Sequence, residues 1–154
     1  MAQDGEGPGE YIGGRASYAE RECIAPKDAR TILMSGNCNG QVYTINGPAG
    51  APYVDPAELY IDRAATGKRE VFRTIDMTEI YPGDVLVIKT ISASGWGNPI
   101  DRDVERIRKD VSEGLLSIQR AKNIYGVILD PETLEVNAEA TEQLRKEMRG
   151  KESR

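Results

Sequence analysis

The spacing of hydrophobic positions changes along the chain near residue 100. Before that point, short apolar runs rich in Val, Ile, Thr and Tyr lie between turn signals, a pattern typical of strands. These runs are RTILMS (30–35), QVYTI (41–45), REVFRTI (69–75) and DVLVIKTI (84–91). No segment between them is long and periodic enough to be a crossover helix, so we expect the strands to pair antiparallel.

After residue 100 the pattern becomes helical. Apolar residues recur at spacings of three and four, which predicts an amphipathic helix with one buried face. They are Val104, Ile107, Val111 and Leu115. Asp101 or Asp103 can cap this helix, and Ser117 can cap a second short helix that Gly126 closes in a left-handed conformation. A last helix is expected to begin near Asn137.

Together the two patterns predict an α+β fold, a small antiparallel β-rich body followed by a C-terminal segment of two to three short helices. We expect one compact domain, with a Gly- and acid-rich extended segment at residues 1–23, the β-rich body at 24–100 and the helical segment at 101–154. Inside the body, one helical turn is expected after Asp55, with Pro56 at the first helical position. The first dozen residues are expected to be loose unless another part of the protein holds them.

Composition and charge exclude several classes of function. The chain has 154 residues and a net charge of -5, so it offers no basic surface for the phosphates of nucleic acid. No apolar run approaches the roughly 20 residues that span a bilayer. The N-terminus has neither the basic start nor the apolar stretch of a secretory signal. We therefore expect a cytoplasmic protein with no nucleic-acid and no membrane partner.

The residues that usually carry catalysis are scarce. Without histidine, the chain lacks the commonest general base and the commonest nitrogen ligand of metals. Its two cysteines, Cys23 and Cys38, are expected to be reduced thiols, and they could hold zinc only with ligands from another chain. Asp101, Asp103 and Glu105 form an acidic group whose place at a helix start favours capping over Mg²⁺ binding. With no phosphate-binding loop either, we expect no catalytic, cofactor-binding or metal site in this chain alone.

Trp96, the single tryptophan, lies between two glycines. A large apolar ring in such a flexible stretch is either packed inside its own fold or inserted into a partner. Both interpretations remain open, although interface cores favour Trp and Tyr and the chain has seven tyrosines. The candidate interface residues are Tyr11, Arg15, Gly95, Trp96 and Gly97.

Several short motifs follow one another between Tyr81 and Leu129. They are Pro82-Gly83-Asp84, then Gly95-Trp96-Gly97-Asn98-Pro99, then Asp110-Val111 with Gly114, then Ala121 with Tyr125-Gly126-Val127. In this order they resemble the C-terminal end of the hydantoinase B family, and Gly13-Gly14-Arg15 looks like the start of that terminal region. Two positions depart from the family pattern, because Ser92-Ala93-Ser94 replaces a run of glycines and Asn98 replaces an aspartate.

The resemblance implies a subunit of a larger enzyme. The family's large subunits are several times longer, so this chain looks like their terminal domain detached as a small (beta) subunit of an acetophenone carboxylase-like complex. Such complexes are ATP-dependent and biotin-independent, and they activate an enolate for carboxylation with bicarbonate. The implied partners are hydantoinase A-like and hydantoinase B-like large subunits. ATP and Mg²⁺ would be bound by the A-like chains, and the role implied for this chain is non-catalytic or accessory.

Other functions remain open. In the same superfamily, the chain could be a subunit of an ATP-dependent hydantoinase or oxoprolinase-type hydrolase. A stand-alone β-rich ligand-binding or scaffold module would instead be a stable monomer with Trp96 buried. A small cysteine-dependent enzyme would need a lowered pKa at Cys23 or Cys38.

Overall fold

The computed structural model describes residues 2–34, 47–72 and 77–152. The chain forms two compact units. The β-rich unit contains Ala16–Thr44 and Asp55–Ile91, and the helical unit contains Met1–Arg15, Ile45–Val54 and Ser92–Arg154. The predicted strand at 41–45 and Cys38 lie outside the described residues. The predicted boundaries at residues 23 and 100 stay predictions.

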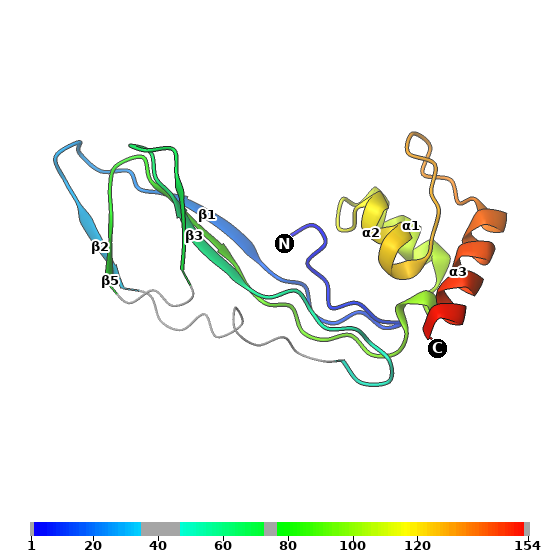
Figure 1. Cartoon of the computed structure of the whole chain (residues 1–154). Coiled ribbons are helices and arrows are strands. Elements are labelled where there is room, and N and C mark those ends of the chain that lie inside the picture. Colours follow the sequence, from blue (N-terminus) through cyan, green and yellow to red (C-terminus); the bar gives the residue numbers. More distant parts are fainter. Residues whose placement is uncertain (1, 35–46, 73–76, 153–154) are drawn as a thin grey trace. The chain divides into compact units, whose positions relative to one another are not determined.

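The described residues of the β-rich unit form two antiparallel sheets (Figure 1). The first has the order β1-β6-β3-β4. Its strands are β1 (Tyr18–Glu22), β6 (Val85–Lys89), β3 (Glu58–Asp62) and β4 (Arg69–Val71). In the second sheet, β2 (Thr31–Met34) pairs with β5 (Met77–Ile80). The antiparallel pairing predicted from the sequence is confirmed.

Strand β3 is the central feature of this unit, and there the predicted helical turn after Asp55 is wrong. Leu59 and Ile61 face Ile88 and Leu86 of the neighbouring strand β6, and all four lie on one side of the sheet. Leu59, Ile61 and Leu86 pack with Ile80 in a buried apolar cluster. Pairing with strands on both sides outweighs the weak helical signal of Pro56, because alternate residues of an extended chain bury one face.

In the described residues of the helical unit there are a short 3-10 helix and three α-helices (Figure 1). They are η2 (Pro99–Asp101), α1 (Val104–Ser112), α2 (Ile118–Tyr125) and α3 (Ala138–Glu152). As predicted, Asp103 and Ser117 accept capping hydrogen bonds from Arg106 and Arg120 backbone N–H groups, at 2.9 and 3.0 Å. Gly126 closes α2 with φ 63°, and Asn137 caps α3. The predicted α+β class is confirmed.

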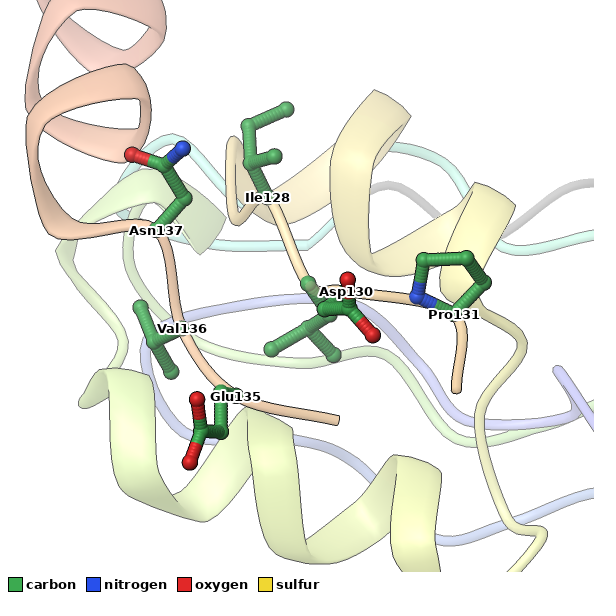
Figure 2. Close-up of a pocket in the computed structure, with 7 residues that line it drawn as sticks. Ile128, Asp130, Pro131, Glu135, Val136 and Asn137 are labelled. Carbon is green, nitrogen blue, oxygen red and sulfur yellow. The ribbon is translucent and has the colours of Figure 1, made fainter. Parts of the chain in front are cut away.

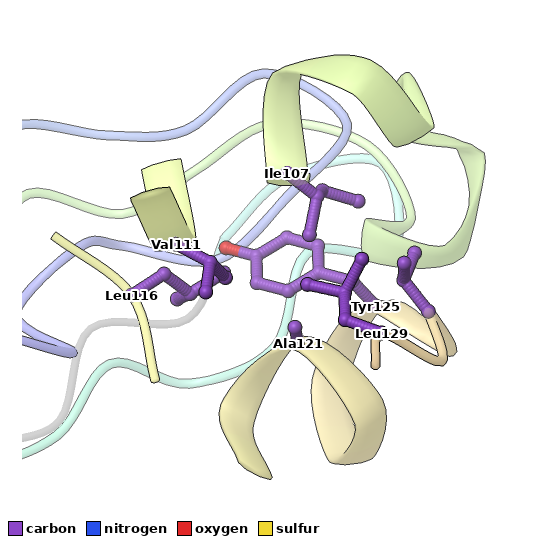
Figure 3. Packing of buried hydrophobic residues seen from close by; sticks show 7 residues of the cluster. Ile107, Val111, Leu116, Ala121, Tyr125 and Leu129 are labelled. Atoms are coloured by element: carbon purple, nitrogen blue, oxygen red, sulfur yellow. The ribbon is translucent and has the colours of Figure 1, made fainter. Parts of the chain in front are cut away.

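One apolar cluster forms the core of this unit, and Figure 3 shows its side chains packed around the ring of Tyr125. Its members are Ile107, Val111, Leu116, Ala121, Tyr125, Val127 and Leu129. Leu116, rather than the predicted Leu115, is the buried leucine, because α1 ends at Ser112 and the chain then turns.

Residues near the N-terminus are part of this unit. The Asp4 N–H donates to the Leu115 carbonyl at 3.1 Å, and the Ser117 N–H donates to the Asp4 carboxylate at 2.6 Å. Ala2 and Glu6 are both buried. The glycine-rich segment is therefore held by the helical unit. From the sequence, this segment was expected to be loose unless another part of the protein held it, and here another part does. None of the helices among the described residues is long and apolar enough to cross a membrane.

Candidate functional site

Tyr11 and Trp96 form an exposed aromatic pair on the helical unit. Their backbones make a two-residue antiparallel bridge, with N–H to carbonyl distances of 3.0 and 2.9 Å. The ring centroids lie 5.9 Å apart at an interplanar angle of 52°. Tyr11 keeps 56% and Trp96 51% of its surface exposed. The structure thus brings together two of the five candidate interface residues, and it does not bury Trp96 as a stand-alone module was expected to.

Gly95 and Gly97, two further candidates, are buried and position Trp96. A Cβ on Gly95 would lie 2.2 Å from the Pro8 carbonyl oxygen, so only glycine allows this approach of the backbones. Gly97 has φ 78°, and a Cβ there would lie 3.0 Å from an oxygen of Glu10. The glycines around Trp96 therefore let the N-terminal segment pack against it.

Arg15, the fifth candidate, is engaged inside the helical unit. Its side chain is 10% exposed, and its guanidinium lies 3.1 Å from the Asp110 carboxylate. It also donates to the Leu115 carbonyl at 3.1 Å. Arg102 donates to the same Asp110 carboxylate at 3.0 Å. These contacts tie the N-terminal segment to α1, so Arg15 supports the site from within.

Glu6 is a buried polar residue that sequence reasoning missed. One carboxylate oxygen accepts from the Arg120 guanidinium at 2.7 Å and from the Tyr125 hydroxyl at 3.0 Å. The other lies 4.0 Å from the Arg15 guanidinium. Burial and the neighbouring Glu6 charge raise the pKa of Tyr125 well above its usual range. Residues separated by more than 100 positions make this network, so no local spacing could reveal it.

A depression of about 350 Å³ lies beside Tyr11. It is lined by Glu10, Tyr11, Asp101, Asp103 and Arg106. Asp103 caps α1, and Asp101 accepts from the Arg149 guanidinium at 2.6 Å. Glu105, the third member of the predicted acidic group, pairs with Arg108 at 2.7 Å. The expected capping role is thus confirmed at Asp103.

A second pocket, of about 430 Å³, lies at the turn between α2 and α3, and Figure 2 shows the residues around it. The Asp130 carboxylate there accepts hydrogen bonds from the Thr133 and Glu132 N–H groups, at 2.8 and 2.9 Å, and from the Thr133 hydroxyl. These bonds lower the pKa of Asp130. The polar groups of this pocket shape a turn and a helix cap, so we assign it no chemistry.

Cys23 lies in the β-rich unit. It is partly buried and packs against the apolar cluster of that unit. In the described part of the chain, no group of three or more His, Cys, Asp and Glu residues could hold a metal ion.

Comparison with known proteins gives the site a context. No family model matches the chain. It is 30% identical over 133 residues to caprolactamase subunit beta of Pseudomonas jessenii, an alignment that covers 84% of this chain. It is 31% identical over 94 residues, 60% of the chain, to the acetophenone carboxylase delta subunit of Aromatoleum aromaticum. The crystal structure of the ATP-dependent caprolactamase from Pseudomonas jessenii superposes with a TM-score of 0.77 over 90% of the chain, at 25% identity.

The chain is homologous to one region of these longer subunits. It spans 22% of the caprolactamase subunit, 14% of the acetophenone carboxylase subunit and 24% of the matched chain in the solved structure. The expected relation to subunits of such ATP-dependent enzymes is therefore confirmed, but only for the region of each subunit that this chain matches. In the acetophenone carboxylase, that region belongs to the delta subunit rather than to the beta subunit that we expected.

Proposed function

We propose that this chain is a non-catalytic, accessory part of a multi-subunit ATP-dependent enzyme, in which it docks against hydantoinase A-like and hydantoinase B-like large partners. The observation that carries the proposal is its homology, over 84% of its length, to a region of a caprolactamase subunit. The exposed Tyr11–Trp96 pair supports the docking role, because aromatic residues with a large exposed area are typical of interface cores.

Two reactions of the complete enzyme are consistent with the relatives. The first is ATP-driven carboxylation of an aromatic ketone such as acetophenone with bicarbonate, in agreement with the acetophenone carboxylase match. The second is ATP-dependent hydrolysis of a cyclic amide, in agreement with the caprolactamase match. The second match covers 84% of the chain against 60% for the first, and this wider coverage favours the hydrolase.

ATP and Mg²⁺ are assigned to the partners. The depression beside Tyr11 is lined by three carboxylates and one guanidinium, a set that repels the phosphates of a nucleotide. The sequence also lacks a phosphate-binding loop. This chain would therefore hold and orient the larger subunits, while nucleotide and bicarbonate bind elsewhere in the complex.

Native mass determination after gentle affinity pull-down of the chain from its own cell extract tests this proposal. We expect much larger hydantoinase A-like and B-like chains in fixed ratio. The mass of the captured chain itself distinguishes a separate small subunit from a longer polypeptide that contains this region. Caprolactam and hydantoin hydrolysis, and incorporation of labelled bicarbonate into acetophenone, are then measured with and without ATP.

The outcomes separate the alternatives. ATP-dependent release of product from caprolactam or hydantoin supports the hydrolase, and labelled carboxylate from acetophenone supports the carboxylase. A lone folded monomer of 16.9 kDa, with neither activity dependent on its presence, would contradict the accessory role and favour a stand-alone module.

A further inference from the structure

The backbone around Trp96 is already hydrogen-bonded within the chain. The N–H and the carbonyl of Trp96 both bond to Tyr11. The Gly97 N–H donates to the Pro48 carbonyl at 3.2 Å, and the Gly97 carbonyl accepts from the Glu10 N–H at 3.4 Å. A partner strand therefore has no free backbone group to pair with at Trp96 and Gly97. This stretch can contact a partner only through its side chains.

The Tyr11–Trp96 pair presents two rings and two hydrogen-bond donors. Both residues keep more than half of their surface exposed. In the described part of the chain, neither the Tyr11 hydroxyl nor the Trp96 indole N–H bonds to another residue. A phenol hydroxyl and an indole N–H both donate hydrogen bonds. The pair can therefore combine ring packing with two bonds to acceptors on a partner.

The charges around the pair balance one another, so they do not select a charged partner. Three carboxylates lie near the pair, and three guanidiniums lie near these carboxylates. They are Glu10, Asp101 and Asp103, with Arg106, Arg145 and Arg149. Since partners meet with complementary potentials, the segment that fits here is uncharged.

An uncharged segment that meets two rings and two donors must present free carbonyl oxygens beside apolar groups. Helices and strands use their carbonyls internally, whereas a polyproline II segment has no internal hydrogen bonds and leaves them free. Proline supplies both features, because it fixes the chain in this conformation and its ring packs against aromatic side chains. The close approach of Gly95 to Pro8 fixes the backbone next to Trp96, so binding would order little on either side.

We propose that the Tyr11–Trp96 pair receives a proline-rich segment of a partner polypeptide in the polyproline II conformation. Proline rings pack on the two aromatic rings, and free carbonyl oxygens of the segment accept from the Tyr11 hydroxyl and the Trp96 indole N–H. The inference rests on the proposed function in one respect, namely that the chain docks against a larger polypeptide. It adds the chemistry of the segment that makes the contact.

Trp96 makes the test direct because it is the only tryptophan in the chain. The full chain is titrated with acetyl-hexaproline-amide, while Trp96 fluorescence and the single indole N–H resonance are recorded. The first matched probe, acetyl-(Gly-Ser)3-amide, has free carbonyls but no apolar rings. The second, acetyl-(Gly-Leu)3-amide, adds apolar side chains without a fixed backbone. We expect a saturable shift with hexaproline only, which added salt leaves unchanged because the contact is uncharged.

Two variants at Tyr11 separate the donor from the ring. Tyr11→Phe keeps the ring and removes the hydroxyl, so hexaproline binding is expected to weaken about fivefold, the loss of one hydrogen bond. Tyr11→Ala also removes the ring and is expected to weaken binding at least about tenfold. Tyr18→Phe is the matched control and should bind as the wild type does, because Tyr18 is an exposed tyrosine of the β-rich unit. Circular dichroism confirms that each variant is folded.

Four results would overturn the inference. The first three are the absence of a saturable shift with hexaproline, an equal shift with either matched probe, and hexaproline binding that both Tyr11 variants leave unchanged. The fourth is a Trp96 shift that follows the concentration of the chain alone, with a dimer in sedimentation, because a second copy would then occupy the pair.

These results are independent of the pull-down. A large complex that is captured from the extract, from a chain with no hexaproline response, contradicts the inference but not the proposed function. A specific hexaproline response from a lone monomer supports the inference while contradicting the proposed function.

Discussion

At the scale of single residues, buried charges stabilise each unit from within. Asp84 in the Pro-Gly-Asp turn of the β-rich unit is buried, yet its carboxylate accepts from the Arg63 guanidinium at 2.8 Å and from the Ala64 and Tyr81 N–H groups. Burial alone would raise the pKa of Asp84, but the Arg63 and backbone hydrogen bonds outweigh it and lower the pKa below its usual value of 3.8. The Pro-Gly-Asp motif, which is part of the family resemblance, thus also links two loops of this unit by hydrogen bonds.

This lowered pKa predicts how stability depends on pH. Since the folded-state pKa lies below the unfolded one, the Asp84 charge stabilises the protein above about pH 4, and this contribution is lost as pH falls through the folded-state pKa. Asp84→Asn should cost about 2 to 3 kcal/mol at pH 7, because Arg63 loses its buried partner. Its free energy of unfolding should also change less between pH 5 and pH 3 than that of the wild type.

Urea unfolding at a series of pH values measures both effects. Asp28→Asn, at an exposed carboxylate of the same unit, is the control and should match the wild type. If the free energy of unfolding of Asp84→Asn and of the wild type changed equally with pH, other carboxylates would be responsible for the loss of stability in acid.

At the scale of elements, local signals predicted the helices better than the strands. The caps at Asp103, Ser117 and Asn137 and the left-handed Gly126 could be predicted because capping depends on residues within one turn. Strand β3 could not, because its extended form depends on pairing with β6 and β4, whose residues are 7 to 31 positions away. A proline after an aspartate carried a helical signal that the sheet overrode.

Three glycines of the helical unit distinguish two reasons for keeping glycine, namely a left-handed backbone and a lack of space for a Cβ atom. Gly126 has φ 63°, and a Cβ there would lie 2.9 Å from Arg145, whereas Gly114 has φ 69° with open space around it. Gly126→Ala should therefore cost about 2 kcal/mol and Gly114→Ala about 1 kcal/mol, the strain of the left-handed backbone alone. Gly150 lies inside α3 with open space around it. Gly150→Ala should therefore raise the free energy of unfolding by up to about 1 kcal/mol, because alanine favours the helix more than glycine does.

Thermal and urea unfolding of the three alanine variants gives this ranking. A destabilised Gly150→Ala variant would mean that α3 does not contribute as a regular helix at that point, and equal losses at Gly114 and Gly126 would mean that Arg145 moves aside without cost.

At the scale of the whole chain, the N-terminal segment and the stretch around Trp96 build one surface although about 80 residues separate them. Gly7 and Gly13 both approach the Ala93 carbonyl so closely that a Cβ would lie 1.7 and 2.1 Å from it. The structure brings Tyr11 next to Trp96 through this contact between backbones. Both residues were candidates from the sequence, but their pairing, and the burial of Arg15 with Glu6, followed from no spacing along the chain.

Gly7→Ala tests this closure. Because the added methyl group meets backbone atoms that cannot move aside cheaply, we expect a loss of about 2 to 3 kcal/mol in the free energy of unfolding, together with a shift in Trp96 fluorescence. Gly14→Ala is the matched control, because its Cβ would make an ordinary contact at 3.5 Å with Ala93. An unchanged Trp96 signal in Gly7→Ala would show that the Tyr11–Trp96 bridge forms independently of the residues around Gly7.

The sequence by itself determined the helix caps and the lack of a phosphate-binding loop, because each depends on residue types within a few positions of one another. It also determined the α+β class and the antiparallel pairing, because no segment between the strand-like runs is long and periodic enough to be a crossover helix. The tertiary structure alone decided that Trp96 is exposed beside Tyr11, that Arg15 turns inward to Asp110, and that Glu6 is buried against Arg120 and Tyr125. Those arrangements depend on which distant segments the packing brings together. The hydrophobic pattern within one segment does not indicate which other segment it will contact.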